Sequence, residues 1–368
     1  MLPRDKTEHE RASTPLELFV DLCFVVGVAQ AASALHHALA EGHLHHGVQG
    51  FLMMFFAVWW AWMNFTWFAS AYDTDDVPYR LVTFVQVVGV LVLAAGIPRG
   101  FEGHLGIPVL GYVIMRVAMA TQWVRAGRGS EGSTCYRYAA GIVVTQLGWV
   151  GILAVPSDAV VWVFLLLVAV ELLVPLWAER TGETSWHPGH IAERYQLFTL
   201  IVLGEVVLAS TLALQGAADG HAGDLVGVVV GAPLTVFAMW WVYFSKSDAG
   251  RLTQDVAFVW GYGHYLVFGS AAALGAGVAV QVDLGLHQAH VSDVAGAAAV
   301  TVPLAVFVLS VWWLHLRPHH TDRWHLVLFP GAAAAVLAAT FLPQPLVVCG
   351  VLLVALLVAG YRTAELRT

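Results

Sequence analysis

The placement of lysine and arginine constrains this chain more than any other sequence feature. About a dozen apolar stretches are each long enough to span a bilayer. Of the 17 lysines and arginines, all but Arg99 and Arg116 fall on one side of these stretches. Because basic loops stay in the cytoplasm, the pattern predicts an integral membrane protein with cytoplasmic termini. The residues on the inner side are Arg4, Lys6, Arg11, Arg80, Arg125, Arg128, Arg137, Arg180, Arg194, Lys246, Arg251, Arg317, Arg323, Arg362 and Arg367.

The composition is typical of a chain surrounded mainly by lipid. Hydrophobic residues make up 59% of the sequence and charged residues 11%, whereas a soluble domain carries about 25% charged residues. The expected partner is therefore the lipid bilayer. The net charge of −8 is spread over inner loops of mixed sign, which argues against nucleic-acid binding. The three cysteines show no metal-binding spacing, and no cofactor is predicted.

The apolar stretches predict an all-α fold, a polytopic transmembrane bundle of about 12 helices. An even number of spans keeps the basic loops on one side, whereas removing one span would invert part of the pattern. The expected spans are residues 16–35, 49–71, 80–97, 107–125, 137–155, 159–177, 193–214, 225–244, 258–280, 295–316, 325–342 and 346–361.

The two halves of the chain share a spacing of aromatic residues. A Leu-Phe pair opens the first and the seventh span, and a Trp-Trp pair follows 41 and 43 residues later. Six helices per half would relate the halves as parallel repeats. The expected organisation is a cytoplasmic tail at 1–14, a first six-helix half at 15–180 and a second at 187–362.

Charged and titratable groups inside the spans are the candidates for function, because a charge at the bilayer centre costs about 2.5–3.5 kcal/mol. The candidates for coupling or for an ion pathway are Glu17, Asp21, Arg116, Glu171, His190, Glu193, Arg194, Glu205 and His264.

The first span carries two acids one turn apart. Thr14, Pro15 and Glu17 fit a capping box, in which Glu17 reaches back to the helix N-terminus. Asp21 lies one turn deeper on the same face, among apolar residues, so the cap does not account for it. A buried aspartate needs a cation, a hydrogen-bond donor or a proton. Asp21 is therefore expected either inside the bundle or at an end reached from the cytoplasm.

Arg116 and Glu205 are expected near the middle of their spans. At a rise of 1.5 Å per residue, Glu205 lies about 16 Å deeper in the bilayer than the start of the seventh span. The adjacent Gly204 would allow the backbone of another helix to approach closely. An ion pair of Arg116 with Glu205 or with Glu171 is expected. Such a pair would be either interhelical glue or part of a substrate or proton path.

The other candidates lie near the predicted inner interface. Glu193 and Arg194 open the seventh span, where an arginine side chain can extend to the interface. His264 lies near the inner end of the ninth span. It is expected to be either a hydrogen-bonded packing residue or a proton relay.

Histidines crowd the first loop on the predicted outer side. Histidine-rich tracts bind zinc, copper or nickel, so His37, His43, His45 and His46 are weak metal candidates. Their spacing is irregular and no cysteine joins them. A weakly charged, pH-responsive loop is therefore expected, and no metal site is predicted.

Two long motifs resemble the bacterial low temperature requirement A (LtrA) family. They are residues 10–26 (ERASTPLELFVDLCFVV) and residues 190–205 (HIAERYQLFTLIVLGE), and the resemblance covers essentially the whole chain. Ile191 stands where the family usually has an aromatic residue, and Val20 where it usually has phenylalanine. Neither difference touches a charge. The resemblance implies a multi-spanning bacterial inner-membrane protein linked by name to growth in the cold, and it implies no particular activity.

A fainter similarity is to six-plus-six potassium channels, whose first helix carries Phe-Ser-Asp. Phe19, Val20 and Asp21 have that rhythm without the serine. The similarity indicates architecture more than conduction.

The leading functional hypothesis is a proton- or cation-coupled secondary transporter for a small ion or molecule. Asp21 and Glu205 would couple transport to protons or cations, Arg116 would be a counter-charge or anion clamp, and His264 would assist proton transfer. The alternatives are a six-plus-six cation channel and a structural or cold-stress membrane protein without flux. No nucleophile or metal-ligand constellation is present, so the chain is not expected to be an enzyme. The sequence predicts no oligomeric state.

Overall fold

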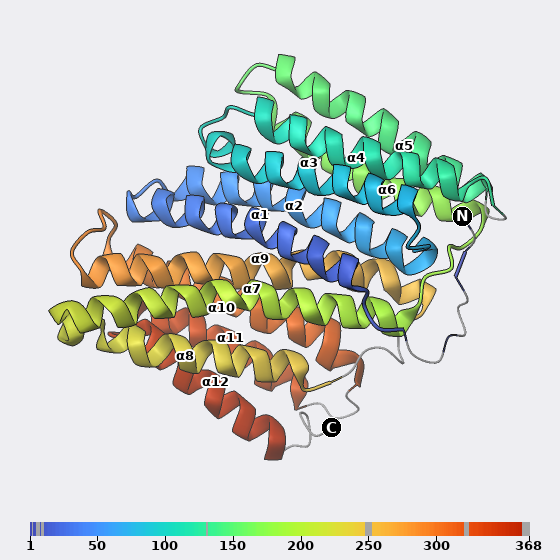
Figure 1. Cartoon of the computed structure of the whole chain (residues 1–368). Helices are drawn as coiled ribbons and strands as arrows, with labels where there is room; N and C mark the ends of the chain where they lie inside the picture. Colours follow the sequence, from blue (N-terminus) through green and yellow to red (C-terminus); the bar gives the residue numbers. More distant parts are fainter. Residues whose placement is uncertain are drawn as a thin grey trace. The chain divides into compact units, whose positions relative to one another are not determined.

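The computed structural model describes residues 1, 3–4, 8, 11–129, 132–246, 252–319 and 324–362. Within these ranges the chain is helical and contains no strand (Figure 1). In lipid every backbone N–H and C=O must be bonded inside the protein, and a helix does this within one segment. The α-helices are α1 (Pro15–Ala40), α2 (Leu44–Tyr72), α3 (Val77–Phe101), α4 (Gly106–Ala126), α5 (Gly132–Gly151), α6 (Val160–Ala178), α7 (Pro188–Gly216), α8 (Ala222–Phe244), α9 (Gln254–Gly285), α10 (Asp293–Val311), α11 (His325–Ala338) and α12 (Pro345–Arg362).

The predicted all-α membrane fold is confirmed. Nine helices in the described part of the chain are long and apolar enough to cross a membrane. One of them, Pro188–Phe244, is 57 residues long and contains both α7 and α8, which a turn at Gly220 with a φ of 108° separates. The helices Leu326–Phe341 and Pro345–Tyr361 are shorter. The count of twelve crossings and the six-plus-six repeat stay predictions.

Two compact units divide the chain. The first holds Met1–Ala31 and Met53–Arg194, and the second holds Ala32–Leu52 and Tyr195–Thr368. The expected division into a tail and two six-helix halves stays a prediction. Four of the basic residues expected on the inner side, Lys6, Arg251, Arg323 and Arg367, lie outside the described residues.

Glycines bring helix backbones into contact within the first unit. Here α3 packs on α4, α4 on α5, and α5 on α6 (Figure 1). A Cβ added at Gly111 would lie 2.3 Å from the backbone nitrogen of Leu93, and one at Gly89 would lie 2.8 Å from the carbonyl oxygen of Gly111. Such close approach is how small residues hold helices together in membranes, where no hydrophobic force drives helices toward each other.

The second unit uses the same packing. Its main contacts are α9 with α10, α8 with α12, and α10 with α11. A Cβ added at Gly277 would lie 2.1 Å from the carbonyl oxygen of Ala299, and one at Gly231 would lie 2.5 Å from the carbonyl carbon of Leu346. Glycine is therefore required at these contacts for the helices to keep their spacing.

Charged residues secure the start of α3, on the predicted inner side. The carboxylate of Asp76 accepts a hydrogen bond from the backbone N–H of Tyr79 at 2.9 Å, which caps the helix. Arg125, at the end of α4, forms an ion pair with Asp76. The hydrogen bond from Arg125 is the main factor that lowers the pKa of Asp76.

Candidate functional site

The first unit places two acids of α1 against two basic residues of α7. Glu17 and Asp21 are one turn apart on α1, and His190 and Arg194 are one turn apart on α7, so each helix presents its pair on one face. All four side chains are at most 1% exposed. We call these four residues the α1–α7 ladder. It joins two motifs that are 173 residues apart in the sequence.

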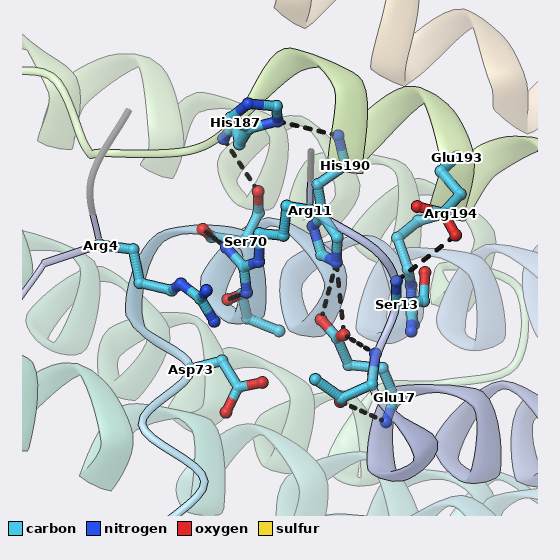
Figure 2. A network of polar contacts seen from close by, with 12 residues as sticks. Arg4, Arg11, Ser13, Glu17, Ser70, Asp73, His187, His190, Glu193 and Arg194 are labelled. Atoms are coloured by element: carbon cyan, nitrogen blue, oxygen red, sulfur yellow. Dashed lines mark hydrogen bonds and ion pairs between the residues drawn. The ribbon is translucent and has the colours of Figure 1, made fainter. Parts of the chain in front are cut away.

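One rung of the ladder joins Glu17 to His190, and we call it the Glu17–His190 rung. The backbone N–H of Thr14 donates to Oε2 of Glu17 at 2.7 Å, and the N–H of Glu17 lies 3.3 Å from Oγ1 of Thr14, so the capping box is present. Nε2 of His190 lies 3.2 Å from Oε1 of Glu17 (Figure 2). Nδ1 of His190 is buried and has no hydrogen-bond partner among the described residues. The contact with His190 goes beyond what a helix cap requires.

The second rung joins Asp21 to Arg194, and we call it the Asp21–Arg194 rung. Oδ1 of Asp21 accepts hydrogen bonds from Nη2 of Arg194 at 2.6 Å and from the indole N–H of Trp62 at 2.8 Å. Oδ2 of Asp21 is buried without a partner among the described residues. A carboxylate has about four acceptor positions. The Asp21–Arg194 rung therefore keeps one carboxylate oxygen that can bind a proton or accept another hydrogen bond.

Arg194 does not extend to the interface as the sequence analysis expected. Its side chain is fully buried, and its Nε and Nη1 atoms have no partner among the described residues. The expectation is wrong because a carboxylate at Asp21 would otherwise be a lone buried charge, which is the costly state. The neighbouring Glu193 makes a weaker contact, in which the N–H of Ser13 lies 3.4 Å from Oε1.

A cluster of buried polar residues, Arg11, Ser70 and Asp73, lies beside the Glu17–His190 rung, where α2 ends. We call these three residues the polar cluster. The guanidinium of Arg11 donates to the carbonyl oxygens of Ser70 and Ala69, the latter at 2.8 Å, and so satisfies groups that a helix C-terminus leaves open. Burial lowers the pKa of Arg11, against the opposing charge of Glu17. Burial also raises the pKa of Asp73, and the charge of Glu17 raises it further. The polar cluster is thus a partly desolvated group of acidic and basic side chains.

His187 connects the polar cluster to the ladder. Its backbone N–H donates to Oγ of Ser70 at 3.0 Å, and its Nδ1 accepts from the backbone N–H of His190 at 3.2 Å. Figure 2 shows His187 above Ser70 and His190, with His190 pointing toward Glu17. Polar groups therefore follow one another from the end of α2 to Glu17. The sequence analysis missed Arg11, Ser70, Asp73 and His187 as members of this network, although the first motif includes Arg11.

A second buried acid in the first unit has every oxygen position occupied. Glu171 is fully buried, and its carboxylate accepts hydrogen bonds from five side chains of the same unit. They are Trp60 at 2.9 Å, Tyr112 at 3.0 Å, Arg116 at 2.8 Å, Gln146 at 3.3 Å and Trp149 at 3.1 Å. Of the two ion pairs expected for Arg116, the structure forms the one with Glu171. Such saturation favours a fixed carboxylate that holds α2, α4, α5 and α6 together.

Tryptophans of α2 serve both buried acids. Trp60 donates to Glu171 and Trp62 donates to Asp21, and both side chains are fully buried. The sequence analysis did not identify Trp60 and Trp62 as donors to buried acids. Their depth in the span was the available signal, because a buried indole N–H needs an acceptor.

Glu205 stands apart from these clusters. It lies in the second unit, and it has no hydrogen bond or ion pair among the described residues. The adjacent Gly204 does not provide the expected close approach, because a Cβ added there would meet no atom within 4 Å. Gly275 of α9 provides it, because a Cβ at that position would lie 2.8 Å from the Cβ of Glu205. Helix rotation, which the sequence does not reveal, decides between the two glycines.

His264 is part of a buried group in the second unit. Its Nδ1 lies 2.8 Å from the carbonyl oxygen of Trp260, so a proton on Nδ1 leaves Nε2 as an acceptor. The hydroxyl of Tyr243 and Nε2 of His315 lie 3.1 Å and 3.0 Å from that nitrogen. The sequence analysis missed His315 and Tyr243. Tyr243 comes from α8, and His315 comes from the π-helical turn after α10.

The histidines of the first outer loop do not gather around a common centre. His37 stacks on His36 with ring centroids 4.9 Å apart, and His36 pairs with Asp283 at 2.6 Å. His43 lies 3.9 Å from Glu41, and both are largely exposed. The described residues contain no group of three or more His, Cys, Asp or Glu side chains that would hold a metal ion.

Apolar helices with fully buried acid–arginine pairs define a multi-pass α-helical membrane protein. The chain belongs to the family of the bacterial low temperature requirement A protein (LtrA), which it matches over residues 12–360. It is also 29% identical over 288 residues to the uncharacterized protein RA0937 of Rhizobium meliloti (strain 1021). That match covers 73% of this chain and 69% of the relative.

Proposed function

We propose that this protein is a secondary transporter that couples solute movement to protons through the α1–α7 ladder. The supporting observation is Oδ2 of Asp21, a buried carboxylate oxygen without a partner among the described residues. Ionisable groups inside a membrane bundle are costly and mark ion or proton pathways. Oδ2 is the place where a proton binds.

Protonation of Asp21 changes the contact between α1 and α7. The ion pair with Arg194 at 2.6 Å depends on the negative charge of Asp21. When Oδ2 takes a proton, the Coulombic attraction between the two charges is lost, and a hydrogen bond from the charged guanidinium to a neutral carboxyl group remains. This gives the two helices a charge-dependent tie, which is what alternating access requires.

The proposed proton route to Asp21 begins at the polar cluster, near Arg11 and Asp73. His187, His190 and Glu17 follow it inward, and Glu17 lies one turn before Asp21 on α1. Histidine exchanges protons at neutral pH, so His190 suits the step before Asp21. Glu171 is not the coupling acid, because its oxygens already accept five hydrogen bonds.

Replacing Asp21 by asparagine is expected to abolish coupling and to preserve the fold. The amide keeps the acceptor for Trp62 and Arg194 but carries no exchangeable charge. The assay uses proteoliposomes with an internal pH dye and an imposed potential, and it screens inorganic ions and small organic solutes. The proton flux of the variant should be at least about tenfold lower than that of the wild type. Glu102→Gln, which neutralises an exposed acid between α3 and α4, should leave flux unchanged, and Asp21→Glu should restore part of it.

Three outcomes would contradict this proposal. Equal proton movement in the wild type and in Asp21→Asn would exclude the ladder as the coupling site. No proton movement with any solute, in protein that is folded, would favour the reading in which the buried charges only hold the bundle. Current that does not saturate with ion concentration would indicate the channel.

We also propose that the protein resides in the inner membrane with both termini in the cytoplasm. The support is the distribution of the basic residues, since all but Arg99 and Arg116 lie in segments expected on the inner side. In intact cells, a membrane-impermeant thiol reagent should label a cysteine placed at His43 and spare one placed at Arg128. The reverse labelling would invert the orientation.

A further inference from the structure

The second unit contains a cavity that the ladder does not explain. Its volume is about 510 Å³, within the range of about 300–1,000 Å³ that small-molecule sites occupy. The first residues of α8, α10 and α12 border it, together with the last residues of α9 and the segment after α11. These helix ends lie on the side that the basic residues predict to be outer.

The polar groups of this cavity are acidic or neutral. Asp224 and Asp293 supply two carboxylates, Gln281 and Gln344 supply carboxamides, and Thr340 supplies a hydroxyl. Among the described residues that line it there is no lysine, arginine or histidine, and leucine, valine, proline, alanine and phenylalanine side chains form the remaining walls. The cavity therefore combines negative charge with apolar surface.

Helix dipoles alone do not account for this charge. Acids are common in the first turn of a helix, where they offset the positive end of the dipole, and Asp224 and Asp293 both lie there. Three N-termini and two C-termini border the cavity. At about half a charge each, they leave about half a positive charge. Two carboxylates exceed this, so the cavity stays net negative.

Two of the polar side chains make defined contacts, whereas Asp224 and Asp293 are exposed. Oγ1 of Thr340 lies 2.6 Å from Oγ1 of Thr301. Gln344 has a φ of 57°, which is uncommon for a residue with a side chain, and its carboxamide occupies the space beside Gly227, where a Cβ would lie 1.5 Å from Oε1. A few polar groups on apolar walls are the usual composition of a small-molecule site.

We propose that this cavity binds an organic ammonium ion with an apolar body, and that Asp224 and Asp293 are its counter-charges. The carboxylates attract the ammonium group, the apolar walls contact the body, and the carboxamides and Thr340 orient it. The ammonium group belongs either to a free amine or to a choline lipid headgroup. The inference concerns equilibrium binding, so it stands or falls separately from the proposed proton coupling.

The test compares three solutes that share a benzyl group and differ in charge. In nanodiscs of phosphatidylglycerol, calorimetric titration of the whole chain should show binding of benzyltrimethylammonium at least about tenfold tighter than that of 2-phenylacetamide, and weaker binding still of phenylacetate. Asp224→Asn and Asp293→Asn should each weaken binding about fivefold, the effect of one charge in a partly exposed site. The matched control is Asp219→Asn, which neutralises an exposed acid outside the cavity and should leave the affinity unchanged.

A second variant tests the volume of the cavity. Val294 lines it from an exposed position, 51% accessible, so Val294→Trp fills space without disturbing the core and should abolish binding of benzyltrimethylammonium. If nanodiscs that contain phosphatidylcholine suppress this binding, the natural source is a lipid headgroup; if they do not, it is a free amine. Equal binding of the three solutes by the wild type would overturn the proposal, and so would unchanged affinity in both aspartate variants.

Discussion

Replacing Glu171 by leucine is expected to lower the free energy of unfolding by roughly 3–5 kcal/mol, the cost of leaving a buried charge without its partner. The substitution removes the acceptor of five hydrogen bonds and leaves the guanidinium of Arg116 unpaired in a site that is about 1% exposed. Thermal and denaturant unfolding in detergent, followed by the intrinsic fluorescence of the tryptophans, would measure the loss.

The matched variants separate the charge from the hydrogen bonds. Arg116→Met leaves a carboxylate that keeps four neutral donors, so a smaller loss of about 1.5–3 kcal/mol is expected. The double variant Arg116→Met, Glu171→Gln removes both charges and keeps an acceptor, and it should be milder than Glu171→Leu. Strict additivity of the effects of Arg116→Met and Glu171→Gln, each measured alone, would show that the two charges do not interact. Glu183→Leu, at an exposed position, should change stability little.

Replacing Gly277 by alanine is expected to destabilise the second unit by about 1–3 kcal/mol or more. The new Cβ would lie 2.1 Å from the carbonyl oxygen of Ala299 and 2.6 Å from its carbonyl carbon. Both atoms belong to the backbone of α10, so the contact is relieved only if the two helices move apart. Unfolding measured under the same conditions would give the effect.

Gly204 provides the control for this second prediction. It also lies inside a helix of the second unit, and a Cβ there would meet no atom within 4 Å. Gly204→Ala should therefore raise stability by about 0.5–1 kcal/mol, because alanine loses less backbone freedom in a helix. A similar gain of stability in both variants would show that helix propensity, and not the contact of α9 with α10, governs Gly277.

Several features of this protein follow from the sequence without a structure. Long apolar stretches with few charges define the membrane helices, because lipid offers no hydrogen bonds to an irregular backbone. The capping box of Thr14 and Glu17 is local, so spacing is enough to predict it. The motifs around residues 10–26 and 190–205 indicate the LtrA family that the chain matches over residues 12–360.

The partners of the buried charges are decided only by tertiary structure. Periodicity gives the face and the depth of a residue on its own helix, and this placed Asp21 and Glu17 together. It does not give the rotation of one helix against another. Sequence depth therefore left Arg116 with two potential partners, and Arg194 seemed free to reach the interface.

Packing settles these questions by bringing together groups that are far apart in the chain. Asp21 meets Arg194 across 173 residues, and Glu171 meets Arg116 across 55. Trp60 and Trp62, two residues apart, donate to different acids because α2 turns about 100° per residue, so residues two apart point to nearly opposite sides. The sequence determined which charges enter the membrane, and the helix packing determined which of them are fully hydrogen-bonded and which keep an oxygen without a partner among the described residues.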